Sequence, residues 1–177
     1  MGFILLQPMP QPKPAVQPIN ASGLTAKPVN RGLPRRLQIP RLKVDAAVAY
    51  MGLTKSGDMD TPTNTKDVGW YKYGSLPGNP GSAVISGHID GPKGEPAVFA
   101  ELSKLQIGDQ FTVIDSTGRS TSFVVRSMRT YGENDPATEV FNSREGAHLN
   151  LITCSGEWDK VQRHFLKRLV IFSDKSG

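Results

Sequence analysis

The sequence predicts an all-β domain with one or two short helices, arranged as a β-barrel or a β-sandwich. Its apolar segments are short, and Gly, Pro and Asp separate them from residue 36 onward. The chain holds 18 Gly and 14 Pro in 177 residues, a content that favours many turns over long helices. Short strands with frequent turns are typical of barrels and sandwiches, whereas βαβ folds alternate strands with longer helices.

Seven segments have the pattern of strands, being short apolar runs bounded by turn residues. Pro40 interrupts the first of them, because proline lacks the N–H group that a strand ladder requires. Residues 116–119, Ser-Thr-Gly-Arg, join two strands into a hairpin. The predicted strands are 36–44, 46–54, 82–89, 110–115, 120–128, 148–154 and 165–172.

Two segments predict short helices. In 97–105, Val98, Leu102 and Leu105 recur at helical spacing after Pro96, a residue favoured in a first helical turn. Residues 136–141 predict one further helical turn. Residues 55–64 have loop composition.

Charge and proline divide the chain into a basic, proline-rich leader over 1–35 and a domain over 36–177. Residues 1–45 hold seven basic side chains and one acidic one, whereas residues 46–177 hold 14 basic and 15 acidic ones. The net charge of +5 therefore belongs to the leader, and no nucleic-acid partner is expected for the domain. Eight of the 14 prolines lie in the first 40 residues, so the leader is either a semi-rigid stalk or a disordered, solvated tail.

The small numbers of Cys and His exclude several kinds of site. The single cysteine, Cys154, excludes an internal disulfide and structural zinc sites with two or more thiolates. Only three histidines accompany it, so we expect neither a metal nor a cofactor. No window approaches the roughly 18 apolar residues of a membrane span.

Cys154 and His88 are the candidate nucleophile and its proton partner. Each ends an apolar strand, and rigid strands aim side chains into sites built from loops. A thiol of ordinary pKa is only a few per cent ionised at neutral pH and needs a base or a cation nearby. His148 lies about 20 Å from Cys154 along one extended strand and is a poor partner, whereas His164, before the last strand, stays open. The alternative is a small buried cysteine and a structural histidine.

Arg168 is the candidate cation for a developing oxyanion. It interrupts the apolar run of the last strand, where a guanidinium is costly unless it is paired or directed into a site. The alternatives are a charge that protects an edge strand from aggregation, and Arg163 in the same role. Lys167 has the pattern of an ordinary exposed charge. Asp90, two residues after His88, either orients the imidazole or begins a surface turn.

The order of these residues resembles the sortase family. His88, then Cys154 within Leu-Ile-Thr-Cys, then Arg168 before an apolar run have the order and approximate spacing of the sortase catalytic residues. Residues 68–90 are similar to the sortase segment that leads to the catalytic histidine, and the likeness covers about 36–173. The segment Cys-Ser-Gly-Glu-Trp-Asp is most similar to the actinobacterial classes E and F, with class F preferred.

The resemblance implies a closed eight-stranded β-barrel and a cysteine transpeptidase that cleaves a C-terminal LPXTG-like sorting signal. In this family reaction Cys154 forms a thioester with the signal's Thr, Arg168 donates hydrogen bonds to the oxyanion, and His88 protonates the leaving amine. Thr153, next to the nucleophile, is assigned to substrate binding. The expected partners are surface proteins that carry the signal, and an amine acceptor on a peptidoglycan precursor or a pilin lysine.

The likeness also implies a location and a wall for the substrate. The expected location is the extracytoplasmic face of a Gram-positive cell membrane, reached through an anchor absent from this chain, with the leader as a stalk. We expect the segment 127–145 to contact the sorting signal, and Trp158 to pack rather than to bind substrate. The calcium site of class A is not carried over, because Ser155 and the loop 156–164 depart from that pattern.

Three other interpretations compete with this one. An L,D-transpeptidase places Gly and Arg tightly around its cysteine, which Thr-Cys-Ser-Gly at 153–156 does not reproduce. A papain-like protease has its Cys before its His, the reverse of this chain. A non-enzymatic, β-rich surface binding domain with an inert Cys154 stays open, and thiol reactivity distinguishes it from an enzyme.

Overall fold

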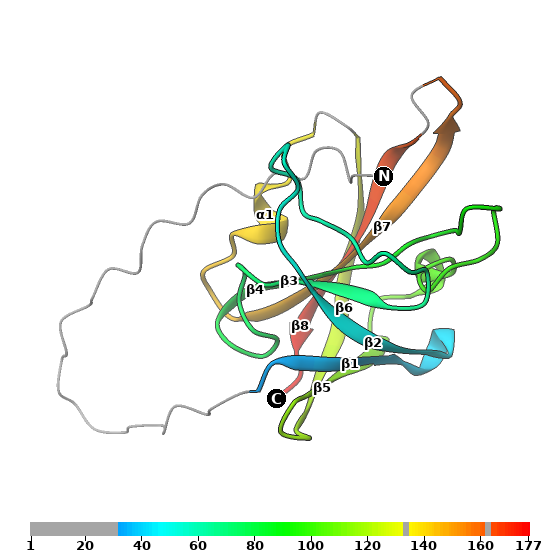
Figure 1. Cartoon of the computed structure of the whole chain (residues 1–177). Helices are drawn as coiled ribbons and strands as arrows, with labels where there is room; N and C mark the ends of the chain where they lie inside the picture. Colours follow the sequence, from blue (N-terminus) through cyan, green and yellow to red (C-terminus); the bar gives the residue numbers. More distant parts are fainter. Residues whose placement is uncertain (1–31, 133–134, 162–163) are drawn as a thin grey trace, which may run out of the picture.

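Eight strands close into a barrel in the computed structural model of the chain, which describes residues 32–132, 135–161 and 164–177 (Figure 1). Their order around the barrel is β1-β2-β3-β4-β7-β8-β6-β5. The all-β class and the closed eight-stranded barrel are therefore confirmed, and the sandwich alternative is excluded. The strands are β1 (Pro34–Ile39), β2 (Val44–Met51), β3 (Val68–Tyr71), β4 (Gly81–Ser86), β5 (Gln110–Asp115), β6 (Ser120–Gly132), β7 (Ala147–Asp159) and β8 (His164–Lys175).

The break at Pro40 is as predicted. A one-turn 3-10 helix, η1 (Pro40–Leu42), follows β1, and Lys43 then takes a left-handed φ of 55° before β2 returns antiparallel to β1. Proline suits this first helical position because its missing N–H would have no partner there. The predicted leader over 1–35 lies outside the described residues as far as residue 31, and β1 begins at Pro34.

The segment 97–105 is not the helix that its apolar spacing predicted. It runs through turns into a 3-10 helix, η2 (Leu102–Lys104), and buries Phe99, Leu102 and Leu105 on the core. These side chains are three residues apart, which is the repeat of a 3-10 helix. A spacing of three over so few residues does not distinguish a 3-10 helix from an α-helix, and the prediction failed for that reason.

One strand was missed by the prediction, and two others extend further than predicted. β3 was missed because all four of its residues are buried, so the sequence shows no alternation there. β7 continues to Asp159 and β8 begins at His164, so the predicted loop over 156–164 is largely a two-stranded ribbon. Trp158 packs edge-on against Phe165 across this ribbon, with ring centroids 5.1 Å apart.

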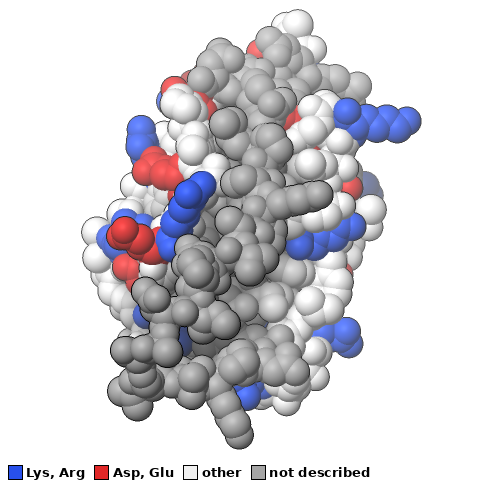
Figure 2. All heavy atoms as spheres, turned by 90° about the vertical axis from the view of Figure 1, so that its left-hand side faces the viewer, with Lys and Arg blue, Asp and Glu red and all other residues white. Residues whose placement is uncertain are grey.

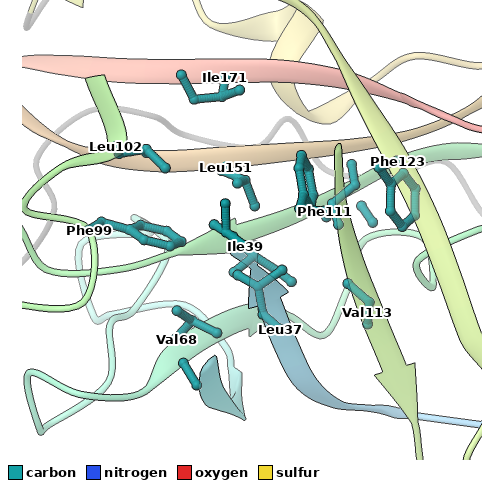
Figure 3. Packing of buried hydrophobic residues seen from close by; sticks show 14 of the residues in the cluster. Leu37, Ile39, Val68, Phe99, Leu102, Phe111, Val113, Phe123, Leu151 and Ile171 are labelled. Carbon is teal, nitrogen blue, oxygen red and sulfur yellow. The ribbon is translucent and has the colours of Figure 1, made fainter. Parts of the chain in front are cut away.

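The inward-facing side chains of the strands form one apolar cluster, the barrel core (Figure 3). Leu37, Phe111, Phe123 and Leu151 are among its fully buried members. The rings of Phe111 and Phe123 stack with centroids 5.8 Å apart across the β5–β6 hairpin. Fully burying such a side chain contributes about 1.5–3 kcal/mol to stability, so this core supplies the main driving force for closing the barrel.

A second apolar cluster, the outer cluster, covers the opposite face of the sheet. The short helix α1 (Thr138–Phe141), predicted over 136–141, contributes Val140 and Phe141 to it. Cys154 is partly buried against this cluster. Its buried members are Met59, Tyr71, Val84, Tyr131, Ala137, Val140, Phe141, Ile152, Val170 and Phe172.

The surface carries charges of both signs. On the part of the face drawn in Figure 2 that the described residues form, basic side chains lie directly beside acidic ones. Ion pairs on the barrel include Arg36 with Asp45 and Arg126 with Asp174. Within the described part of the chain, no helix is long and apolar enough to cross a membrane.

The close approach of Gly87 to Phe99 gives a test of the packing. A Cβ at position 87 would lie 2.5 Å from the Phe99 ring, so we expect Gly87→Ala to lower the free energy of unfolding. The expected cost is about 1–3 kcal/mol, measured by chemical denaturation. Phe99→Leu in the same chain should recover part of it. The control is Gly132→Ala, whose Cβ would have its nearest neighbour at 3.5 Å, and equal costs for both alanines would contradict the packing.

Candidate active site

Cys154 lies in the middle of β7 rather than at its end, where the sequence analysis expected it. The ladder with β8 continues beyond the cysteine, with a bulge between Ser155 and Trp158. Gly156 adopts a φ of 77° in this bulge, a conformation that favours glycine. A bulge bends its strand and redirects nearby side chains, so the sequence Cys-Ser-Gly marks a change of strand direction directly after the thiol.

Strand alternation places the thiol of Cys154 on the outer face of the barrel. Leu149 and Leu151 point into the barrel core, and Thr153 shares their side of β7. Ile152 and Cys154 point the other way and contact the outer cluster. The thiol is partly exposed and lies outside the barrel core, so the structure does not give it the position of a core cysteine.

Arg168 lies directly opposite Cys154 in the antiparallel ladder of β7 and β8. Arg168 is 6% exposed, and its Nη1 donates hydrogen bonds to the carbonyls of Phe165 at 2.7 Å and Lys167 at 2.8 Å. β6 flanks it on the other side, because Tyr131 is its partner there. Arg168 is therefore held inside the sheet beside the thiol. It is not a charge on an edge strand, since the barrel is closed.

His88 is brought to the same level by the parallel pairing of β4 with β7. Ser86 is in register with Ile152, and the N–H of Gly87 donates to the Ile152 carbonyl at 3.0 Å. The hydroxyl of Thr153 donates to the Gly87 carbonyl at 2.8 Å. Extending this register by two residues predicts that His88 lies level with Cys154. The histidine follows β4 by two residues, whereas the sequence analysis placed it in the strand.

The imidazole of His88 has a defined hydrogen bond on one nitrogen. Nε2 lies 2.7 Å from the carbonyl oxygen of Pro62, in the segment that precedes β3. Because a carbonyl only accepts hydrogen bonds, Nε2 carries the proton. In the neutral ring Nδ1 is therefore the basic nitrogen, and the ring orientation is set by the main chain.

Burial and two charges act on the thiol. Burial raises the pKa of Cys154, and this is the largest effect. The positive charge of Arg168 lowers the pKa of the same thiol, and the negative charge of Asp90 raises it. Asp90 pairs with Pro96 in an isolated bridge on either side of a turn, which agrees with the surface-turn interpretation. The sequence analysis weighed it only against His88 and missed its influence on the cysteine.

The other predicted residues lie elsewhere or outside the described chain. His148 forms a 2.7 Å contact through Nδ1 with Asp174, six ladder positions away from the cysteine. His164 is the first residue of β8, opposite Asp159, rather than a loop residue. Arg163, the fallback cation, lies outside the described residues.

The segment 127–145, which we expect to contact the sorting signal, includes the end of β6 and the helix α1. Its first six residues belong to β6, and α1 covers the outer face of β4 and β7 with Val140 and Phe141. Asn150 of β7 fixes the position of α1, because its Nδ2 donates to the Val140 carbonyl at 2.6 Å.

Trp158 is 40% exposed and packs on Phe165 beyond the thiol. Among the described residues, no group of three or more His, Cys, Asp or Glu could hold a metal ion.

Comparisons with known proteins show the family of this chain. A family model of the sortase domain matches residues 37–176. Sortase D of Bacillus subtilis strain 168 is 30% identical over 118 residues, which is 67% of this chain and 52% of that protein. The chain thus spans about half the length of this curated relative.

Solved structures share the fold. Sortase C-1 of Actinomyces oris superposes with a TM-score of 0.64 at 23% identity, covering 80% of this chain and 73% of that one. Sortase A of Corynebacterium diphtheriae superposes with a TM-score of 0.64 at 18% identity, covering 85% and 63% of the two chains. These relatives are of classes A, C and D, so the preference for class E or F stays a prediction. The family model covers nearly the whole domain, and the chain belongs to the sortase family of cysteine transpeptidases.

Proposed function

We propose that this protein cleaves an LPXTG-like sorting signal and transfers the cut protein to an amine, with Cys154 as nucleophile. The observation that carries the proposal is the position of Cys154 between Arg168 on one neighbouring strand and the Gly87–His88 segment on the other. Arg168 faces Cys154 across β7 and β8, and the segment Gly87–His88 borders β7 on its other side, which supports the roles of cation and base that we assign to Arg168 and His88. This is the arrangement that acyl transfer through a thioester requires.

In the first half-reaction the thiolate of Cys154 attacks the carbonyl carbon of the signal's Thr. The carbonyl oxygen becomes an oxyanion, and the guanidinium of Arg168 donates hydrogen bonds to it. As the intermediate collapses, the Thr–Gly bond breaks and His88 gives its proton to the departing amine. The products are a thioester on Cys154 and the released C-terminal segment, with a neutral imidazole.

In the second half-reaction a primary amine attacks the thioester carbonyl. His88 accepts the proton that the attacking amine loses, and the sulfur leaves as the thiolate beside Arg168. The new amide joins the cut protein to its acceptor, for which we propose a peptidoglycan precursor or a pilin lysine. The enzyme returns to its starting state without an oxidant, a reductant or a metal in any step.

The reactive form that we propose is the Cys154 thiolate beside the guanidinium of Arg168. Burial disfavours a lone thiolate and raises the pKa of Cys154, whereas Arg168 favours the thiolate. A substrate that excludes water from the site strengthens this attraction, because the local dielectric constant falls. We therefore assign Arg168 two tasks, stabilising the thiolate before attack and the oxyanion after it.

The proposed setting is the outer face of the membrane of a Gram-positive cell. The partners are surface proteins that carry the sorting signal. We assign the leader over 1–35 the role of a spacer between the barrel domain and the membrane. Proline-rich segments suit such a spacer because polyproline II is stiff and extended.

Removal of the three proposed catalytic groups is the first test. With a fluorogenic LPXTG peptide and an added amine, we expect Cys154→Ala to abolish turnover. His88→Ala should reduce kcat/KM by about 10²–10⁴-fold, and Arg168→Ala by about 10²–10³-fold. The control for the arginine is Lys167→Ala, its exposed basic neighbour, which should leave turnover near the wild-type value.

Two outcomes of that comparison would contradict the assignments. Undiminished turnover by Cys154→Ala would end the proposed mechanism. Loss of activity in Arg163→Ala, together with full activity in Arg168→Ala, would transfer the role of the cation to the other arginine.

The ionisation of the thiol gives a second test, measured as the pH dependence of alkylation by iodoacetamide. Because burial raises the pKa of Cys154, its titration midpoint should lie above that of a cysteine in an unstructured peptide. Arg168→Gln removes a cation and should move the midpoint to higher pH. Asp90→Asn removes an anion and should move it to lower pH. Equal midpoints in both variants and in the control Arg119→Gln would refute the electrostatic coupling.

Thr153 gives a third test, because its buried hydroxyl bonds the Gly87 carbonyl that precedes His88. The sequence analysis assigned Thr153 to substrate binding, whereas this contact supports a positioning role. Thr153→Val keeps the shape and loses the hydrogen bond, at a cost of about 1–3 kcal/mol. A positioning role predicts a lower kcat with little change in KM, and recovery in Thr153→Ser. A rise in KM alone would instead support the role in substrate binding.

A further inference from the structure

The structure contains a pocket, lined by both polar and apolar side chains, on the outer face of the barrel and separate from the proposed catalytic row. Its volume is about 720 Å³, within the usual range for ligand sites. It lies between β6 and α1, and the starts of β4 and β7 form its floor through Ser82, His148 and Asn150. Among the described residues that line it, Cys154, His88 and Arg168 do not occur.

Two arginines from β6 enter this pocket with unused donors. Arg126 pairs with Asp174 through Nε at 3.1 Å, and its guanidinium lies 5.7 Å from the centre of the Phe172 ring. Arg129 pairs with Glu139 of α1 through Nη1 at 2.6 Å. Arg129 also lies over the Tyr131 ring, 4.9 Å from its centre, and interacts with the Tyr131 hydroxyl. Among the described residues, both Nη groups of Arg126 have no hydrogen-bond acceptor. Planar guanidinium forks of this kind match a carboxylate.

The floor of the pocket supplies an acceptor. Asn150 is 1% exposed, and its Nδ2 is used by the Val140 carbonyl. Its Oδ1 is buried and has no hydrogen-bond partner among the described residues. An unpartnered buried carbonyl is costly, so a ligand that brings an N–H group to it is favoured. Donors from two arginines and an acceptor from Asn150 together fit a peptide that carries a carboxylate.

We propose that this pocket binds a carboxylate-bearing segment of a peptide that takes part in the transfer reaction, with Arg126 and Arg129 as its recognition residues. This inference rests on the proposed function. Glu139 is the built-in competitor, because it occupies one donor of Arg129 and adds a negative charge to the wall. An acidic ligand binds to the remaining donors.

The pocket lies within reach of a peptide held at the thiol. Asn150 and Cys154 share one face of β7 and are four residues apart, which is about 13 Å. An extended peptide spans about 3.3–3.6 Å per residue, so the residues just before an LPXT segment bound at Cys154 fall at this distance. A peptide acceptor that enters from the same side has a similar reach. The shared chemistry is a peptide carboxylate, from either the donor or the acceptor.

Direct binding tests the proposal without turnover. In protein carrying Cys154→Ala, the fluorescein-labelled peptides Glu-Glu-Leu-Pro-Ala-Thr-Gly and Gln-Gln-Leu-Pro-Ala-Thr-Gly are compared by fluorescence anisotropy. We expect the acidic peptide to bind more tightly, and Arg126→Gln or Arg129→Gln each to weaken it by about three- to fivefold. Glu139→Gln frees Arg129 and should tighten binding about twofold. The exposed Arg119→Gln, in the β5–β6 turn, is the charge-matched control and should change nothing.

A second arm uses the acceptor. Transfer by the wild-type protein is measured with Gly-Gly-Glu and with Gly-Gly-Gln amide as the amine. A preference for the acidic acceptor that both arginine variants lose assigns the pocket to the acceptor, whereas the same loss with the donor peptides alone assigns it to the donor. Equal binding and equal transfer of acidic and neutral peptides would overturn the proposal. So would arginine variants that match Arg119→Gln while urea unfolding shows them folded.

The two proposals fail separately. Binding of the acidic peptide through Arg126 and Arg129, with no turnover of any LPXTG peptide, would keep the pocket and refute the transpeptidase reaction. Turnover that depends on Cys154 but not on the charge of the peptides would do the reverse.

Discussion

The arrangement of the site depends on one parallel strand pair, β4 with β7. Six residues of each strand are in register, from Gly81 opposite Ala147 to Ser86 opposite Ile152. Two hydrogen bonds extend the register beyond the end of β4, from Gly87 to Ile152 and from Thr153 to Gly87. A shift of one residue in this pair would turn the side chains of one strand to the opposite face. It would also break the hydrogen bonds that align Gly87 with Ile152 and Thr153.

The segment from Gly87 to Phe99 makes further contacts that hold the backbone of His88 in position. The ring of Phe99 lies against the backbone of Gly87, and the N–H of Phe99 donates to the carbonyl of His88 at 2.9 Å. The histidine is thus held by β7 on one side and by the following segment on the other. Its ring is held by Pro62, which comes from a third segment. Such support from rigid neighbours limits the rotamers of a side chain and keeps a reactive group in place.

One face of β7 packs in the barrel interior, and the other carries the residues of the proposed sites. Leu149, Leu151 and Thr153 join the barrel interior and hold the strand in position. Asn150, Ile152 and Cys154 lie on the outer face, where α1 and β6 add the apolar outer cluster and the arginine-lined pocket. Burial raises the pKa of the Cys154 thiol, and the residue is partly exposed on this outer face. Arg168, which crosses from β8, offsets part of that rise.

The sequence by itself determined the all-β class, the break at Pro40, the β5–β6 hairpin and the residues with reactive side chains, because these follow from local pattern and side-chain chemistry. It did not show β3, whose four buried residues lack alternation, or the extent of β7 and β8 beyond Cys154, where a bulge at Gly156 breaks the period. Only the tertiary structure decided which side chains meet. The barrel brings β4, β7 and β8 together from distant parts of the chain and places Arg168 opposite Cys154. It also brings the charge of Asp90 close enough to affect the thiol. His148 contacts Asp174 and not the cysteine. The strand register and the closure of the barrel depend on contacts between residues that are far apart in the chain, so they cannot be predicted from any one segment of the sequence.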